Sequence, residues 1–309
     1  MREESRPRVS IGMPVYNAER YLREALESLL AQTYGDFELL IADNASTDAT
    51  EDLCKKYAAV DDRIRYVGHR ENYGPIANFN DVFRLTSGRY FKWAASDDIC
   101  APDFLSRCVE VLDSDPTVAL ACPRIAGIDQ DGKRIAYVSS PGPGQGQGQD
   151  KDLEAGAAVS ATAGDPTVRW RWMMRNLWWT PHLYGLIRSD VLARTGLHPA
   201  HYMSDHILLA ELALYGRFAE IPEELLHMRI HAGKTSNVTT PRQRLVVAKP
   251  KQAYASWSMP FRLVMVYPER VLAHAASVRR APLTHRQRLA CYVELLAAIL
   301  RWARARVAG

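Results

Sequence analysis

The 309-residue sequence predicts an α/β fold with a mostly parallel central sheet, flanked by helices and followed by a helical C-terminal extension. Two observations predict the sheet. Short apolar runs alternate with helical patterns through the first 125 residues, which is typical of parallel strands joined by right-handed crossovers. One of these runs, Phe37–Ala42, is apolar without interruption, as expected for a strand buried on both faces.

The individual elements follow from the periodicity of apolar residues. Strands are expected at Val9–Met13, Phe37–Ala42, Ile64–Val67, Tyr90–Ala94, Val118–Cys122, Phe218–Ile221 and Leu225–Ile230, with a hairpin formed by Ile125–Ile128 and Arg134–Val138. Helices are expected between these strands, at Tyr202–Leu214, and from His285 to Arg306. Pro75 suits the first position of one of the helices.

Composition suggests how the chain is organised. The strand–helix alternation covers residues 1–125, residues 126–240 continue the domain with a different pattern, and residues 241–309 are expected to form a basic helical extension. The glycine-rich segment 141–164 is expected to be a flexible loop. The N-terminus shows no secretory signal, no apolar run is long enough to span a bilayer, and the five cysteines are scattered. These features favour a cytoplasmic protein.

The net charge of +4 is unevenly distributed. From Arg242 onward there are 13 Lys and Arg against 2 Asp and Glu, so the preceding part of the chain is net negative. The expected helix from His285 to Arg306 is amphipathic, with arginines near both ends. It suits peripheral contact with an anionic membrane at its inner face, but packing on the α/β domain or on a second subunit in a homodimer is slightly favoured over this.

Polar segments follow each of the first four expected strands. They are Pro14-Val15-Tyr16-Asn17, Asp43-Asn44-Ala45-Ser46-Thr47-Asp48, His69-Arg70-Glu71-Asn72-Tyr73-Gly74 and Ser96-Asp97-Asp98. Ligands of open α/β sheets bind outside the carboxyl ends of the strands, so these segments form one candidate site.

Each segment suits one part of a nucleotide ligand. Tyr16 offers a flat face for a base, Asp43 an acceptor for a base N–H, and Arg70 a charge for phosphate. The adjacent carboxylates of Asp97 and Asp98 suit Mn²⁺ or Mg²⁺, which takes one or two carboxylates together with phosphate oxygens. The alternative is that several of the acids only cap helices.

The order of these motifs, PVYN, DNASTD, NYG and SDD, resembles the nucleotide-binding half of inverting GT-A glycosyltransferases of family 2. The resemblance covers roughly residues 8–232. It implies that residues 1–125 bind the nucleotide sugar and that residues 126–240 form the acceptor-binding and catalytic half of the same domain. It implies a GT-A fold, a nucleotide-diphosphate sugar donor and a divalent cation. Asp98 corresponds to the metal ligand, Asp97 lies nearer the ribose, and Asp43 contacts the base. The complete set implied for donor binding is Pro14, Tyr16, Asn17, Asp43, Arg70, Asn72 and Asp97.

The second half of the family pattern is also recognisable. In the family, an acidic pair stands at the start of a helix, and its second member is the catalytic base. The corresponding segment here is Ser204-Asp205-His206, in which serine replaces the first acid, so only Asp205 carries over as the base. His231 matches a histidine that touches the metal or the diphosphate. Trp178, Trp179 and His206 are candidates for contact with a glycan, lipid-linked or small-molecule acceptor hydroxyl.

Two other functions fit parts of the pattern. A nucleotidyltransferase also uses an α/β sheet and a metal, but the segment after the first strand lacks the glycine-rich, basic loop typical of such enzymes. A non-catalytic nucleotide-sugar or glycan-binding protein has no need of both Asp98 and Asp205. No recognisable nucleic-acid-binding module is present, so nucleic acid is not an expected partner.

Overall fold

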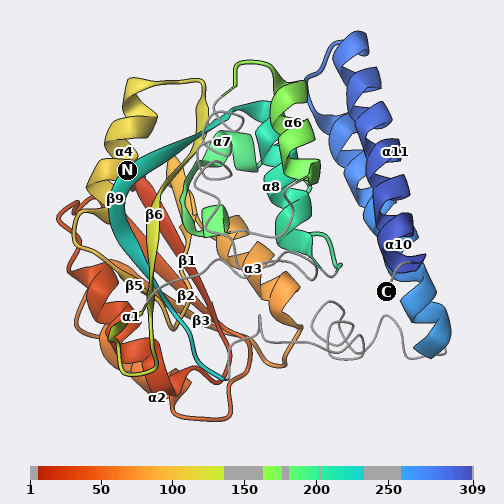
Figure 1. The fold of residues 1–309 in the computed structure, drawn as a ribbon. Helices are drawn as coiled ribbons and strands as arrows, with labels where there is room; N and C mark the ends of the chain where they lie inside the picture. The colour runs from red at the N-terminus through yellow and green to blue at the C-terminus, as the bar shows by residue number, and fades with distance from the viewer. Residues whose placement is uncertain (1–5, 136–162, 176–180, 202, 233–258, 308–309) are drawn as a thin grey trace, which may run out of the picture.

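The computed structural model describes residues 6–135, 163–175, 181–201, 203–232 and 259–307. Its strands form one sheet in the order β3-β2-β1-β4-β8-β6-β9-β5 (Figure 1). Strands β1 (Val9–Val15), β2 (Phe37–Asp43), β3 (Ile64–Gly68) and β4 (Tyr90–Trp93) are mutually parallel. The predicted parallel sheet is therefore confirmed for the N-terminal half.

The other half of the sheet is mixed. Strand β8 (Leu186–Arg188) lies between β4 and β6 (Val118–Ile128), antiparallel to both, whereas β9 (Arg217–Arg229) runs parallel to β6. The edge strand β5 (Ile99–Cys100) is antiparallel to β9.

Two strand assignments need correction. The pairs of short strands expected at 118–128 and at 217–230 are each one continuous strand, because irregularities in the β6–β9 register near Pro123 and Arg124 let both strands bend without ending. The expected hairpin exists: β7 (Arg134–Ile135) pairs with the end of β6.

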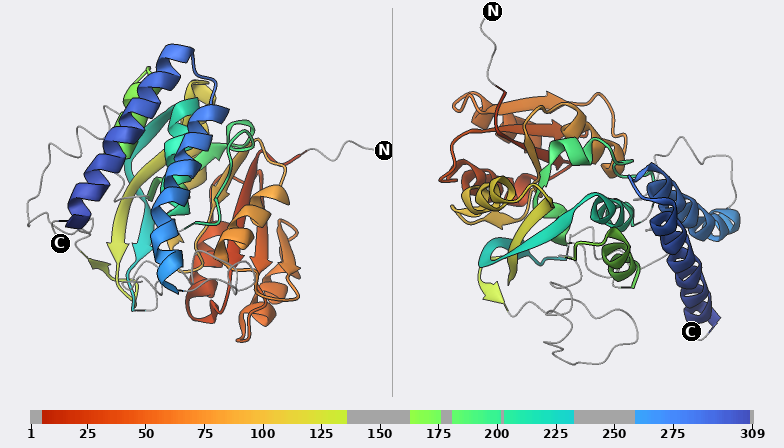
Figure 2. Two further views of the ribbon diagram at one scale, coloured as in Figure 1. Left: turned by 90° about the vertical axis from the view of Figure 1, so that its right-hand side faces the viewer. Right: turned by 90° about the horizontal axis from the view of Figure 1, so that it is seen from above.

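Helices cover both faces of the sheet and divide its apolar residues into two clusters. One cluster lies under α1 (Glu19–Leu30), α2 (Thr50–Ala58) and α4 (Phe104–Ser114). The other lies under α3 (Pro75–Arg84), α6 (Pro166–Arg175), α7 (Ser189–Leu192) and α8 (Ser204–Tyr215), with the 3₁₀ turn η1 (Pro181–Tyr184) beside them. Figure 2 shows these two helical layers on either side of the sheet.

Gly12 determines how closely α3 approaches β1. A Cβ atom at this position would lie 2.7 Å from Cγ2 of Val82 and 2.8 Å from Cζ of Phe91. Contacts that short do not occur between packed carbons, so only glycine lets α3 sit directly on the strand.

The expected C-terminal helices are α10 (Met259–Arg280) and α11 (His285–Val307), which form the outermost layer beside α6 and α8 (Figures 1 and 2). Cys291, Leu295 and Ala298 of α11 belong to the same apolar cluster as α8. Glu211 of α8 accepts hydrogen bonds from Ser277 and from Arg280 of α10. The extension thus packs on the sheet domain. In the described part of the chain no helix is long and apolar enough to cross a membrane.

Candidate active site

The ends of β1 and β2 meet at one edge of the sheet, where Val15 pairs with Asp43. Asp43 is 2% exposed. Its Oδ1 accepts hydrogen bonds from the Ser46 amide at 3.0 Å and the Ser46 hydroxyl at 2.6 Å, and its Oδ2 accepts one from the Tyr66 hydroxyl at 3.0 Å. Burial and this contact with Asp43 raise the pKa of Tyr66. Tyr66, which lies inside β3, was not predicted as a site residue.

The loops after β1 and β2 are joined by Asn17. The Asn17 backbone amide donates to Ser46 Oγ at 2.9 Å, and the Asn17 side-chain Oδ1 accepts from the Thr47 backbone amide at 2.8 Å. Asn17 and Ala45 both have positive φ, 48° and 60°. A non-glycine residue costs about 1–2 kcal/mol in this region, so the surrounding contacts hold these turns in shape.

The third loop, predicted to meet phosphate through Arg70, is tied to the second loop by asparagines. Asn72 Oδ1 accepts hydrogen bonds from Asn44 Nδ2 at 2.9 Å and from the Gly74 amide at 2.8 Å. Arg70 is exposed on this loop. Tyr16, after β1, is 49% exposed, so its ring offers an open face at the same edge.

The acidic turn after β4 is fixed by the end of β9. The Arg229 amide donates to Asp98 Oδ1 at 3.0 Å, and Asp98 is buried. Two residues further on, His231 Nε2 lies 3.0 Å from Asp97 Oδ2, and its ring packs against Tyr21 with centroids 4.8 Å apart. Asp97, Asp98 and His231 are therefore adjacent although 134 positions separate Asp97 from His231.

Arg229 is a residue of this site that was not predicted. It is 0% exposed, and its guanidinium donates to the carbonyls of Asp97, Asp129 and Gln130 and to the Glu24 carboxylate. Its Cζ lies 4.6 Å from the centroid of the Tyr21 ring. A charged residue within an otherwise strand-like segment close to His231 was the available signal, but its partners come from three distant segments.

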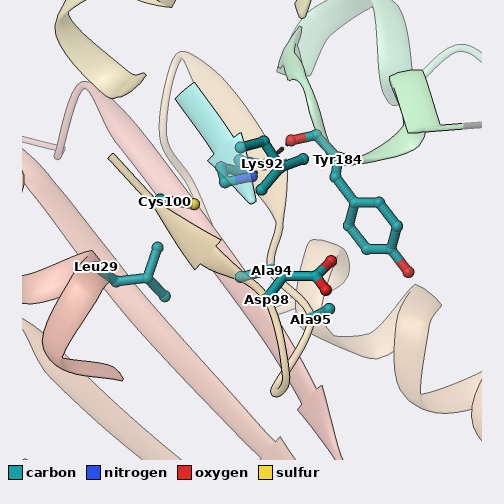
Figure 3. Close-up of a pocket in the computed structure, with 8 residues that line it drawn as sticks. Leu29, Lys92, Ala94, Ala95, Asp98, Cys100 and Tyr184 are labelled. Atoms are coloured by element: carbon teal, nitrogen blue, oxygen red, sulfur yellow. Dashed lines mark hydrogen bonds between the residues drawn. The ribbon is translucent and has the colours of Figure 1, made fainter. Parts of the chain in front are cut away.

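Tyr184 connects the acidic turn to the second half of the site. Figure 3 shows the Asp98 carboxylate pointing toward Tyr184, which lines a small pocket with Asp98, Ala94 and Lys92. Buried Lys92 donates to the Tyr184 carbonyl at 2.6 Å and lies 4.1 Å from the centroid of the Phe104 ring. Lys92 thus holds Tyr184 in place.

The pKa of Tyr184 shows which charges surround its ring. It is raised first by burial and then by the negative charges of Asp98, Asp97 and Asp205. Asp205 therefore lies within electrostatic range of the same tyrosine as the acidic turn.

Asp205 lies in the first turn of α8 and is partly buried. Met203, directly before the helix, has a left-handed conformation with φ 66°, which directs the chain into the helix. The next residue, His206, is 6% exposed and turns inward, and burial lowers its pKa to about 4. This burial makes direct acceptor contact by His206 unfavourable. Trp178 and Trp179 lie outside the described residues, and so do residues 141–162 of the expected loop.

The donor set suits a hard divalent cation only in part. In the described ranges no group of three or more His, Cys, Asp and Glu side chains is arranged to hold a metal. Asp97 and Asp98 offer two carboxylates, which fits the habit of Mg²⁺ and Mn²⁺ of taking one or two carboxylates and completing their shell with substrate phosphate oxygens. For His231 to bind a cation through Nε2, its contact with Asp97 must open.

The arrangement of the site indicates the class of protein to which the chain belongs. Parallel strands end in a cluster of acids, an exposed aromatic ring and an arginine at the nucleotide-binding edge of an α/β sheet. The family "Glycosyl transferase family 2" matches residues 10–183. The chain belongs to this family and has its GT-A fold.

Relatives and solved structures agree with this assignment. An uncharacterized glycosyltransferase of Haemophilus influenzae is 25% identical over 249 residues, which is 81% of this chain and 73% of that protein. The structure of S. aureus TarS 1–349 in complex with UDP has a TM-score of 0.60 at 16% identity, covering 94% of this chain and 70% of that one.

A mannosyltransferase from Pyrobaculum calidifontis in complex with GDP-Man and Mn²⁺ has a TM-score of 0.54 at 19% identity, covering 99% of this chain and 77% of that one. These structural similarities show the fold alone. The matches with several other curated relatives span only 14% to 40% of the length of those proteins.

Proposed function

We propose that the protein transfers a sugar from a nucleotide-diphosphate donor to an acceptor hydroxyl, with inversion at the anomeric carbon and with Asp205 as the general base. The observation that carries the proposal is the contact between the end of β9 and the turn after β4, which brings Asp97 and Asp98 next to His231 at the nucleotide-binding edge of the sheet. Family membership and the similarity to structures that hold UDP or GDP-Man support the donor class.

The donor lies along the carboxyl ends of β1 to β4. The base stacks on Tyr16 and meets Asp43, while Pro14, Asn17 and Asn72 shape the loops around it. Asp97 binds the ribose, and Arg70 offsets diphosphate charge. A divalent cation, Mn²⁺ or Mg²⁺, held by Asp98 with His231, would supply Lewis-acid stabilisation of the leaving diphosphate.

Asp205 accepts the proton of the acceptor hydroxyl as that oxygen attacks the anomeric carbon. Its place in the first turn of α8 suits this role, because the residue is only partly buried there and an acceptor can reach its carboxylate. Attack from the side opposite the leaving diphosphate gives inversion. A positioned base of this kind contributes about 10²–10⁴-fold to the rate.

The matched pair Asp205→Asn and Asp190→Asn tests this assignment. Asp190 is an exposed carboxylate in the first turn of α7, so its substitution controls for the loss of one charge at a helix start. Nucleotide donors and Mn²⁺ are first screened by thermal shift to identify the base. Asp205→Asn is then expected to reduce transfer at least ~10²-fold while donor affinity stays within about twofold. Equal losses of donor affinity and activity would refute the assignment of Asp205 as base.

The two alternative functions give different results in the same assays. A nucleotidyltransferase would release pyrophosphate from a nucleoside triphosphate and a sugar phosphate. A non-catalytic binding protein would bind the donor without transfer or metal-stimulated hydrolysis. Either result, obtained with wild-type protein, would replace the proposal.

A further inference from the structure

Helix α11 carries an apolar stripe on its outward face. Leu289, Val293, Leu296 and Leu300 are 65%, 58%, 62% and 61% exposed. Their spacing of four, three and four residues places them on one side of the helix, along about 16 Å of its length. We call these four residues the outer seam. The inward face, with Cys291, Leu295 and Ala298, already provides the packing on the domain, so the outer seam is not needed for the fold.

The outer seam is a continuous feature. Single exposed apolar side chains are ordinary on protein surfaces, but contiguous patches mark sites of contact. Helix α11 is also in the outermost layer of the molecule, where Figures 1 and 2 show it farther from the sheet than α6. The outer seam is therefore in reach of a partner.

Cationic side chains lie at both ends of the outer seam. Exposed Arg286 precedes Leu289, and Arg301 follows Leu300. Glu294 is the one acid in the sequence of α11; it is buried, and it is shared by Arg171, Arg175 and Arg301 at 3.5, 3.1 and 2.9 Å. Three guanidinium groups on one carboxylate leave an excess of positive charge beside the seam.

This charge pattern decides between a second copy and a lipid surface. Two copies of α11 paired in parallel would bring Arg286 next to Arg286, and in an antiparallel pair Arg286 would meet Arg301. Within α11 no further carboxylate can pair with Arg286 in either arrangement, because Glu294 is already shared by three arginines. Helix pairs are normally matched by opposite charges along the seam. A surface of anionic phospholipids offers phosphates to the arginines and an acyl boundary to the apolar residues.

We propose that α11 docks the protein on an anionic phospholipid surface, with the outer seam at the acyl boundary and the arginines on headgroup phosphates. This goes beyond the proposed function, since it requires neither a nucleotide sugar nor an active catalytic centre. Its consequence is that transfer takes place beside the membrane plane, within reach of acceptors held there.

Vesicle flotation of the purified chain tests the proposal. Vesicles of phosphatidylcholine with 30% phosphatidylglycerol are compared with vesicles of phosphatidylcholine alone, without nucleotide. We expect wild-type protein to float with the anionic vesicles only, and the triple variant Leu289→Gln, Leu296→Gln, Leu300→Gln to partition at least tenfold less. The substituted positions are exposed, and thermal melting by circular dichroism checks that the variant stays folded.

A matched variant, Val60→Gln, controls for the loss of an exposed apolar side chain elsewhere, because Val60 is 79% exposed in the turn after α2. It is expected to bind like wild type. Arg286→Gln is expected to weaken binding and to reduce its salt dependence. Absence of flotation would overturn the proposal, as would equal binding by the triple variant. A wild-type dimer in light scattering that becomes monomeric in the triple variant, without vesicle binding, would show that a second copy covers the outer seam.

Discussion

Replacing Arg229 by methionine should both destabilise the fold and weaken the acidic turn. The guanidinium is completely buried and donates four hydrogen bonds, to three backbone carbonyls and to Glu24. Methionine has similar length but no donors. The carbonyls of Asp97 and Gln130 would lose this donor, and that of Asp129 would keep only the Gly132 amide at 3.1 Å. Glu24, which is about half exposed, would regain water.

The size of the effect follows from these contacts. Leaving a buried acceptor unsatisfied costs about 1–3 kcal/mol, and breaking a buried ion pair costs about 3–5 kcal/mol in total. Because Glu24 is solvated, we expect Arg229→Met to lower the free energy of unfolding by about 3–4 kcal/mol. Arg229→Lys keeps the charge but not the forked geometry, so about half of that loss is expected.

Equilibrium unfolding in urea measures the loss of stability in both variants, provided that the dependence of the unfolding free energy on urea concentration is unchanged. Arg84→Met removes an exposed arginine paired with Asp81 and should cost less than about 0.5 kcal/mol. The affinity of Mn²⁺ and nucleoside diphosphate is measured on the same samples. If Arg229→Met unfolds within 1 kcal/mol of wild type (roughly the error of such comparisons), the network around Arg229 does not hold the turn as described.

Three further predictions concern other parts of the structure. Asp98→Asn keeps an acceptor for the Arg229 amide but loses the negative charge. Calorimetry should therefore show loss of metal-dependent nucleotide binding, with little change in melting temperature. Undiminished binding would exclude Asp98 as a metal ligand. Burial lowers the pKa of His198 and His206 to about 4, below the unfolded value near 6.5. As the pH falls, the unfolded chain therefore takes up protons before the folded protein does. The free energy of unfolding should fall by more than ~2 kcal/mol between pH 7 and 4.5, and the fall should be smaller in the variant His206→Leu. Gly12→Ala should cost about 1–3 kcal/mol in urea unfolding because its methyl group meets Val82; an unchanged midpoint would show that α3 can shift at no cost.

Much of the N-terminal half was predictable because its signals are local. Each of β1 to β4 is a mostly apolar run, and the polar residues at its end lie where a parallel sheet must bring them together. Asn17, Asp43 and Asp98 could therefore be placed at one edge without coordinates. The hairpin of β6 and β7 was likewise visible in the turn residues between the two strands.

The second half was less predictable because its structure depends on distant pairing. Strand β8 has three residues, too few for a periodic pattern, and its place between β4 and β6 depends on those neighbours. Arg229 and Lys92 have partners from other segments, so neither role could be derived from neighbouring residues. Charged residues within apolar strand segments were the visible sign, but a sequence does not show which groups pair with them in the folded protein.

The most direct test is a crystal structure with Mn²⁺ and the nucleoside diphosphate selected by the thermal-shift screen. We expect anomalous density for manganese against the Asp98 carboxylate and the diphosphate, the base between Tyr16 and Asp43, and Asp205 facing the position of the transferred sugar. Manganese or nucleotide bound away from this edge of the sheet, or Asp205 directed away from the diphosphate, would contradict the account.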